Sequence, residues 1–193
     1  MTLGKIPGSF YARDTRKVAR NLLGKILCCK TAEGIAKGRI VETEAYCGDK
    51  DPAAHAYRGK TPRSKIMWGR AGVAYVYFVY GMHHMLNVVT EREGSPGSVF
   101  IRALEPIEGI TLMKQRRKTQ DAKSLTNSPA KLTQALGITM QDNGVDLESG
   151  HLWIEEGRKE KFDIVSTGRV GIKAGKKLQL RFYIKGDEHM SRI

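Results

Sequence analysis

The strongest structural signal in the sequence is the aromatic run VAYVYFVY at residues 73 to 80. Aromatic and β-branched residues favour strands, in which alternate side chains lie on opposite faces. A glycine-containing turn, GMHH, follows this run and precedes a second apolar run, MLNVVT. The pattern predicts an antiparallel β-hairpin whose tip carries Tyr80, Met82 and His83. Large apolar and aromatic side chains would then lie where solvent normally is.

The rest of the sequence predicts further strands and two helices. Strand-like runs occur at KILCCK, GIAKGRIVETEAY, SVFIRALEP, HLWIEE, FDIVS and LQLRFYI, and the first two are expected to pair antiparallel. Asp14 is a suitable cap for a helix over residues 15 to 23. Ser128 and Pro129 begin a second helix, PAKLTQAL, and Gly137 follows its last residue as a helix stop.

The length and continuity of the chain favour one domain. A chain of 193 residues is long enough for one sizeable hydrophobic core and short for two independent ones. The sequence shows no internal repeat, low-complexity tract or linker that would divide it. We therefore predict a single domain over residues 1 to 193, and we expect it to be a monomer.

The composition points to a polyanionic partner. Lys and Arg number 33 against 20 Asp and Glu, which gives a formal net charge of +13. Nucleic acid is the commonest partner of a basic domain, because neutralising its phosphates releases counterions. The lack of an 18-residue apolar run and of a signal-peptide pattern predicts no membrane association and a cytoplasmic location. Three cysteines without a C-x-x-C pair argue against a disulfide framework and against structural zinc.

Residues 41 to 56, VETEAYCGDKDPAAHA, bring together several residues suited to hydrolysis. On a strand, Glu42, Glu44 and Tyr46 share one face. His55 follows in a short helical turn that Asp51 and Pro52 open, because aspartate caps a helix and proline suits its first position. A carboxylate can activate water, and aromatic planes can hold a flat substrate. Without a catalytic role, the two acids would lie on a solvated strand face or form ion pairs with nearby basic residues. The histidine would be a hydrogen-bonded residue at the start of a helix.

Four more positions are informative. Arg102 interrupts an otherwise apolar strand and needs a partner. Tyr75 and Phe78 are interpreted as core residues, because aromatics favour strands. Tyr80 borders a glycine at the hairpin tip, a position suited to wedging between base steps; the alternative is an exposed tyrosine packed on its own hairpin.

Other possible sites are weaker. His83 and His84 are adjacent and point apart on a strand, so they do not form a usual pair of metal ligands. The fragments GRAG and GSPG lack a P-loop lysine and are better interpreted as turns. The N-terminal amides of the PAKLTQAL helix, in basic surroundings that include Lys131, could receive a phosphate.

Taken together, the segments GRIVETEAY, DPAAH, YVYFVYGMHHMLNVV, RALEP and PAKLTQALGI resemble the alkyladenine (3-methyladenine, methylpurine) DNA glycosylase family, in the short form found in bacteria. The resemblance runs from about Phe10 to Phe182. It implies an α+β single domain around a curved antiparallel β-sheet with a protruding β-hairpin. It also implies excision of alkylated or deaminated purines by cleavage of the N-glycosidic bond, the first step of base excision repair, with double-stranded damaged DNA as partner.

The resemblance also assigns roles to individual residues. Glu44 corresponds to the general base that activates water, and Arg102 to the residue that orients that water and Glu44. Tyr46 would stack on one side of the flipped base, and His55 and Tyr77 would cover the other side. By the same correspondence, Tyr80 fills the gap left in the duplex, and Asn87 discourages ordinary guanine, whose exocyclic amine would clash there.

The remaining implied contacts are with DNA alone, from Met82, His83, Arg63 and Lys131. The family needs neither a metal nor a cofactor. The chain departs modestly from the family pattern at His83, where some relatives carry another aromatic residue, and at Cys47. No lysine or N-terminal amine is placed as a nucleophile, so we predict a glycosylase without strand-cutting lyase activity.

Two rival functions remain open on the sequence. A non-catalytic nucleic-acid-binding protein would share the basic charge and the aromatic hairpin. A metal-dependent nuclease would use Glu42, Glu44 and the histidines, and its activity would be lost in chelator.

Overall fold

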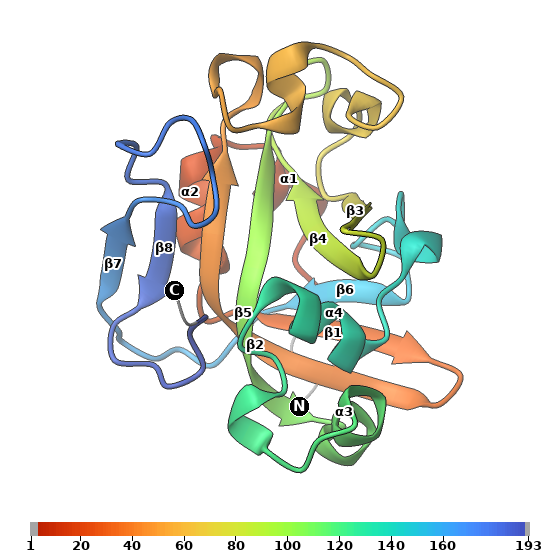
Figure 1. Cartoon of the computed structure of the whole chain (residues 1–193). Helices are drawn as coiled ribbons and strands as arrows, with labels where there is room; N and C mark the ends of the chain where they lie inside the picture. The colour runs from red at the N-terminus through yellow and green to blue at the C-terminus, as the bar shows by residue number, and fades with distance from the viewer. Residues whose placement is uncertain (1–3, 192–193) are drawn as a thin grey trace.

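Strand β2, Gly34–Tyr46, organises the fold because it hydrogen-bonds to three other strands (Figure 1). The computed structural model describes residues 4 to 191. The first part of β2 pairs with β1, Ile26–Thr31, and most of its length pairs with β5, Ser98–Glu108. Near its end, β2 pairs with β8, Arg181–Ile184, on the edge that β1 has left. The predicted β1–β2 hairpin is confirmed.

Within residues 4 to 191 the strands form one eight-stranded sheet whose hydrogen-bonded neighbours all run antiparallel. Its main path runs β3–β4–β5–β2–β1–β6, and β7 extends the sheet beyond β8. The strands not yet bounded are β3 (Ala74–Val79), β4 (His83–Val89), β6 (Leu152–Glu155) and β7 (Ile164–Thr167). The predicted α+β class with an antiparallel sheet is confirmed. The domain limits, 1 and 193, stay a prediction, because both lie outside the described residues.

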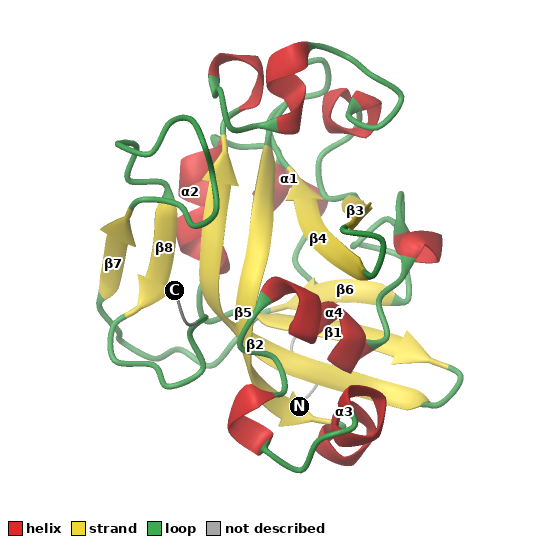
Figure 2. Ribbon diagram, viewed as in Figure 1, coloured by secondary structure: helices red, strands yellow, loops and turns green. Residues whose placement is uncertain are grey.

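The two predicted helices are present and capped as their sequences indicate. Helix α2, Thr15–Leu22, begins at Asp14, whose side chain accepts hydrogen bonds from two backbone N–H groups. Helix α4, Pro129–Leu136, begins at Ser128, and Gly137 ends it at a φ of 76°, which suits glycine. Figure 2 shows α2 behind the β2–β5 pair and α4 in front of it, so the two helices cover opposite faces.

Helix α3 was not predicted. It spans Ile110–Arg117, ITLMKQRR, and Met113 is its one fully buried residue among those described. A helix without an apolar stripe gives no periodic signal. The other helical segments are short, namely α1 (Gly8–Tyr11), η1 (Gly48–Lys50), η2 (His55–Arg58), η3 (Lys65–Trp68), η4 (Ala122–Ser124) and η5 (Met140–Asp142).

Two local predictions need correction. Phe78 is 45% exposed and packs against the ring of His84, so its interpretation as a core residue is wrong, whereas Tyr75 is 1% exposed and its core interpretation is confirmed. The helical turn expected from Asp51 onward is displaced along the chain. Asp51 accepts the N–H of Ala53, but the helical segment η2 begins only at His55.

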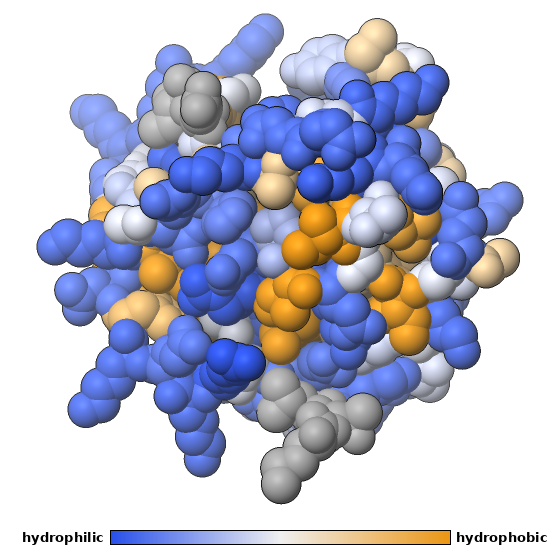
Figure 3. All heavy atoms as spheres, turned by 90° about the horizontal axis from the view of Figure 1, so that it is seen from below, coloured by the Kyte–Doolittle hydropathy of each residue, from blue (hydrophilic) through white to orange (hydrophobic). Residues whose placement is uncertain are grey.

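The surface agrees with the basic composition. Seen from below in Figure 3, the molecule is predominantly hydrophilic, with hydrophobic side chains gathered near the middle of that face. The β3–β4 hairpin protrudes as predicted, because Tyr80 and Met82 at its tip are 89% and 67% exposed. No helix in residues 4 to 191 is long and apolar enough to span a membrane.

Candidate active site

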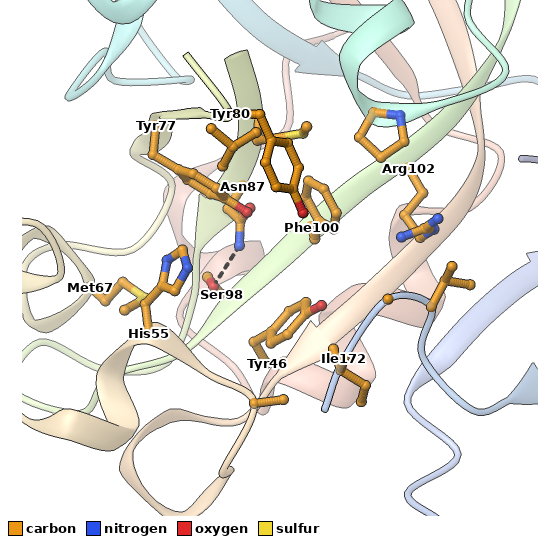
Figure 4. Close-up of a pocket in the computed structure, with 16 residues that line it drawn as sticks. Tyr46, His55, Met67, Tyr77, Tyr80, Asn87, Ser98, Phe100, Arg102 and Ile172 are labelled. Atoms are coloured by element: carbon orange, nitrogen blue, oxygen red, sulfur yellow. Dashed lines mark hydrogen bonds between the residues drawn. The ribbon is translucent and has the colours of Figure 1, made fainter. Parts of the chain in front are cut away.

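A cavity of about 410 Å³ opens where β2, β3, β4 and β5 meet the loop at residues 170 to 172 (Figure 4). Its size lies within the range of small-molecule sites. The predicted substrate contacts converge on it, namely Tyr46, His55, Tyr77 and Asn87. They come from β2, η2, β3 and β4 respectively. The fold therefore gathers these side chains as expected, and their roles stay predictions.

Aromatic rings form two walls of this cavity. Figure 4 shows Tyr46 across the opening from Tyr77 and His55. His55 packs edge-on against Tyr77, with ring centroids 4.8 Å apart, and Phe100 meets Tyr46 edge-on at 6.3 Å. Flat rings facing one another across a gap suit the stacking of a planar heterocycle.

His55 is held by a residue that the sequence assigned only to the core. Its Nδ1 lies 2.8 Å from the Tyr75 hydroxyl. Burial of the ring and the nearby charge of Arg63 lower the pKa of His55 below 6.5. The residue as a whole is nevertheless exposed to solvent. Because its pKa is lowered, His55 is neutral at pH 7, with one ring nitrogen available as a donor or acceptor.

Asn87 is anchored at the floor of the cavity. It is 4% exposed, and its Nδ2 donates to Ser98 Oγ at 2.9 Å. Its Oδ1 is buried without a hydrogen-bond partner in the described part of the chain. An anchored, buried amide presents a fixed bulk to whatever enters the cavity.

Glu44 lies directly behind the cavity wall and is fully buried. Its Oε2 accepts the Tyr46 hydroxyl at 2.9 Å, and its Oε1 accepts the Val170 N–H at 2.7 Å. Arg102 Nη1 lies 3.3 Å from Oε1. The interpretation of Glu42 and Glu44 as a solvated strand face is wrong. A carboxylate has about four acceptor positions, and these contacts fill three of them, which leaves one position on Oε2 without a protein donor.

Irregular strand pairing places Arg102 beside both acids. Glu44 pairs with Phe100 and Glu42 with Ala103, and the ladder between β2 and β5 shifts register on both sides of Glu42. Bulges of this kind re-aim side chains and are common next to active sites. Arg102 donates from Nε to Glu42 Oε1 at 2.8 Å, which supplies the partner that the sequence required.

A buried ion pair fixes the loop that covers Glu44. Arg169 Nη2 donates to Asp51 Oδ1 at 2.7 Å and Nη1 to the Ala45 carbonyl at 2.9 Å, and its guanidinium lies 4.6 Å from the centroid of the Tyr46 ring. Burial opposes ionisation of Asp51, but hydrogen bonds from Arg169 and from two backbone N–H groups outweigh it and lower the pKa of the carboxyl. Neither Arg169 nor Val170 was predicted, because no local sequence pattern links them to β2.

The hairpin tip borders the mouth of the cavity. Tyr80 lines the opening and adopts a φ of 53°, an uncommon conformation for a residue with a side chain. At 89% exposure little of Tyr80 is covered by its own hairpin, and its role in DNA stays a prediction. Met82 and His83 face a separate hollow shared with α4.

The two predicted basic contacts lie outside the cavity lining. The Arg63 guanidinium lies 4.9 Å from the centroid of the Tyr77 ring. Lys131 Nζ donates to Asn127 Oδ1 at 2.9 Å in a polar hollow that also contains Lys123. The roles of both side chains as DNA contacts stay predictions.

Comparison with known proteins agrees with this site. The family model described as methylpurine-DNA glycosylase matches residues 9 to 188. The chain belongs to the methylpurine-DNA glycosylase family. A relative from Methanoculleus marisnigri is 50% identical over 191 residues, covering 97% of this chain and 98% of its own. Relatives from Prosthecochloris aestuarii and Clostridium acetobutylicum are 47% and 46% identical, covering 98% and 97% of this chain and 92% and 97% of their own. All three carry the name "Putative 3-methyladenine DNA glycosylase".

Membership of this family makes the chain a DNA glycosylase, a hydrolase that acts on N-glycosyl bonds in base excision repair. The relatives are both bacterial and archaeal, so the short form is not confined to bacteria. Among the described residues of the glycosylase, no three His, Cys, Asp or Glu side chains gather in a group that could hold a metal ion. His84 instead packs on Phe78.

Proposed function

We propose that this glycosylase flips alkylated or deaminated purines into the cavity and hydrolyses their N-glycosidic bond with a water activated by Glu44. The observation that carries the proposal is the placement of Glu44. The carboxylate lies behind an aromatic cavity, is held by three groups and keeps one acceptor position on Oε2. A water bound there would lie beside Tyr46, which is the wall against which a base would stack.

The chemistry requires little more than these groups. Alkylation at a ring nitrogen puts positive charge on a purine and makes it a good leaving group. The transition state at the sugar is cation-like, so an ionised Glu44 stabilises it electrostatically and also takes the proton of the attacking water. Arg102 balances the charge of the carboxylate and orients the water.

The flipped base would be held by stacking. Extrusion from the duplex costs a few kcal/mol, least for damaged or mispaired bases. Stacking on Tyr46 and against Tyr77 and His55 returns about 1 to 3 kcal/mol per base. No lysine lines the cavity among the described residues, which supports hydrolysis without a covalent intermediate and without strand cutting.

Interactions away from the base would supply most of the sequence-independent affinity. We assign Met82 and His83 to the DNA strands beside the hairpin, and Arg63 and Lys131 to phosphates. The logarithm of the binding constant falls linearly with the logarithm of the salt concentration. Removal of one phosphate-binding side chain should reduce the slope of this line by about one unit. A monomer acting on DNA in the cytoplasm completes the proposal.

The filter role proposed for Asn87 predicts the behaviour of Asn87→Ser. The shorter side chain removes bulk from the cavity floor, so excision of normal guanine is expected to rise about tenfold. The measurement is single-turnover release of guanine from undamaged duplex, with hypoxanthine release as the internal reference. A decrease in guanine excision would show instead that the buried Oδ1 accepts the guanine amine.

The gap-filling role of Tyr80 predicts weaker flipping in Tyr80→Ala. Loss of the exposed ring removes about 1 to 3 kcal/mol of stacking, so lesion DNA should bind about tenfold or more weakly. Tyr80→Phe keeps the ring and is the matched control. Fluorescence of ethenoadenine placed at the lesion reports flipping, and equal signals in all three proteins would contradict the role.

A lesion panel tests the proposed function itself. Duplexes carrying 3-methyladenine, ethenoadenine or hypoxanthine should each release free base and leave an alkali-labile abasic site. Release should be unaffected by EDTA, which distinguishes the glycosylase from a metal-dependent nuclease. No release from any of the three lesions would overturn the proposal and favour a non-catalytic DNA-binding protein.

A further inference from the structure

Glu42 is the centre of a buried network next to Glu44 and is itself fully buried. Its Oε1 accepts from Arg102 Nε at 2.8 Å, Arg181 Nε at 2.7 Å and Ser191 Oγ at 2.8 Å. Its Oε2 accepts the Ser191 N–H at 2.7 Å. Arg181 comes from β8, and Ser191 lies beyond that strand, so segments distant in sequence close around one carboxylate.

This network uses every nitrogen of the Arg102 guanidinium. Nε contacts Glu42, Nη2 donates to Ser191 Oγ at 3.2 Å, and Nη1 lies 3.3 Å from Glu44. The guanidinium is planar and rigid, so two fixed edges determine where the third points. Glu44 therefore receives one corner of Arg102 rather than a two-point ion pair.

The charges explain why this geometry matters. Two carboxylates share Arg102, and Arg181 gives Glu42 a second cation within 2.7 Å. Without the anchor at Glu42, Arg102 would be free to rotate into a bidentate pair with Glu44, the geometry that guanidinium and carboxylate groups favour. Such a pair would occupy the acceptor position on Oε2 that the proposed function gives to water.

We propose that Glu42 is a positioning residue, which Arg181 and Ser191 hold so that Arg102 is kept off the water-binding oxygen of Glu44. The inference rests on the proposed function, because it specifies how the same site keeps its general base available. Glu42 does not touch the substrate. It acts through Arg102. Of the residues in this network, Ser191 is the one whose truncation leaves every charge in place.

The test is Ser191→Ala, which removes one hydrogen bond to Glu42 and one from Arg102 without changing any charge. We expect the single-turnover rate of hypoxanthine release to fall about tenfold or more, since small misplacements of catalytic groups have effects of this size. The affinity for lesion DNA should change less than twofold. Ser191→Thr keeps the hydroxyl and should restore the rate, and Ser149→Ala removes an exposed serine hydroxyl as a matched control.

A double-mutant comparison separates positioning from stability. In an Arg102→Met background the target of positioning is absent, so adding Ser191→Ala should cause no further loss of rate. An equal loss in both backgrounds, or a wild-type rate in Ser191→Ala, would overturn the inference. An inactive wild-type protein would instead reject the proposed function. A thermal-unfolding measurement first establishes that the Glu42→Gln variant is folded. Its rate of hypoxanthine release should then be lowered at least as much as that of Ser191→Ala.

Discussion

Glu44→Gln is expected to lower the rate of base release by about 10² to 10⁴-fold, the usual contribution of a general base. The amide preserves the shape of the side chain. Its oxygen can still accept the Val170 N–H, and its nitrogen can donate to the Tyr46 hydroxyl oxygen, so the packing seen around Glu44 should survive. The substitution removes the negative charge that activates water and stabilises the cation-like sugar.

Single-turnover release of hypoxanthine measures this effect, and the affinity for lesion DNA measured by titration should remain within about threefold of wild type. Glu156→Gln is the matched control, because Glu156 is an exposed partner of Lys25. A wild-type rate of release in Glu44→Gln would remove Glu44 from the role of general base. Weak binding together with slow release would point to a disturbed cavity.

Asp51→Asn should cost about 3 to 5 kcal/mol of the free energy of unfolding, because it leaves Arg169 buried without a counter-charge. Both side chains are nearly inaccessible, at 2% and 0% exposure. In the folded protein the backbone N–H groups of Cys47 and Ala53 each donate to one oxygen of Asp51. In the variant the amide N–H₂ would replace one of these oxygens, so two donors would face each other. The loop from Arg169 to Ile172 should loosen with it.

Urea unfolding of the two proteins at several pH values measures the loss. The hydrogen-bonded carboxyl of Asp51 has a folded-state pKa below its ordinary 3.8, so its contribution is complete above that pH and is lost as the pH falls through the folded-state pKa. The stability difference between wild type and variant should therefore be constant from neutral pH down to about pH 5 and shrink below 3.8. Glu188→Gln, which breaks the exposed pair with Lys123, should leave stability unchanged. A similarly small effect of Asp51→Asn would show that the buried pair does not hold the loop.

Local periodicity and capping predicted most of the elements. Alternating apolar residues located the strands, and the hairpin register follows from the short turn around Gly81. Caps at Asp14 and Ser128 located α2 and α4. Helix α3 had no such signal, since its capping positions are Gly109 and Lys118 in left-handed conformation and its composition is largely polar. It forms because it packs against α4 and β2.

The sequence by itself determined the basic charge, the antiparallel strands, the protruding aromatic tip and the shared face of Glu42 and Glu44. It could not distinguish the two acids, because the alternation of side chains along a strand assigns each residue to a face of the sheet. It does not say which side chains from other segments pack against that face. Only the tertiary structure brought Arg181 and Ser191 to Glu42, and Val170 to Glu44. The reason is that β2 changes partner along its length, from β1 to β8, while β5 runs beside it, so each carboxylate meets a different set of donors from distant parts of the chain.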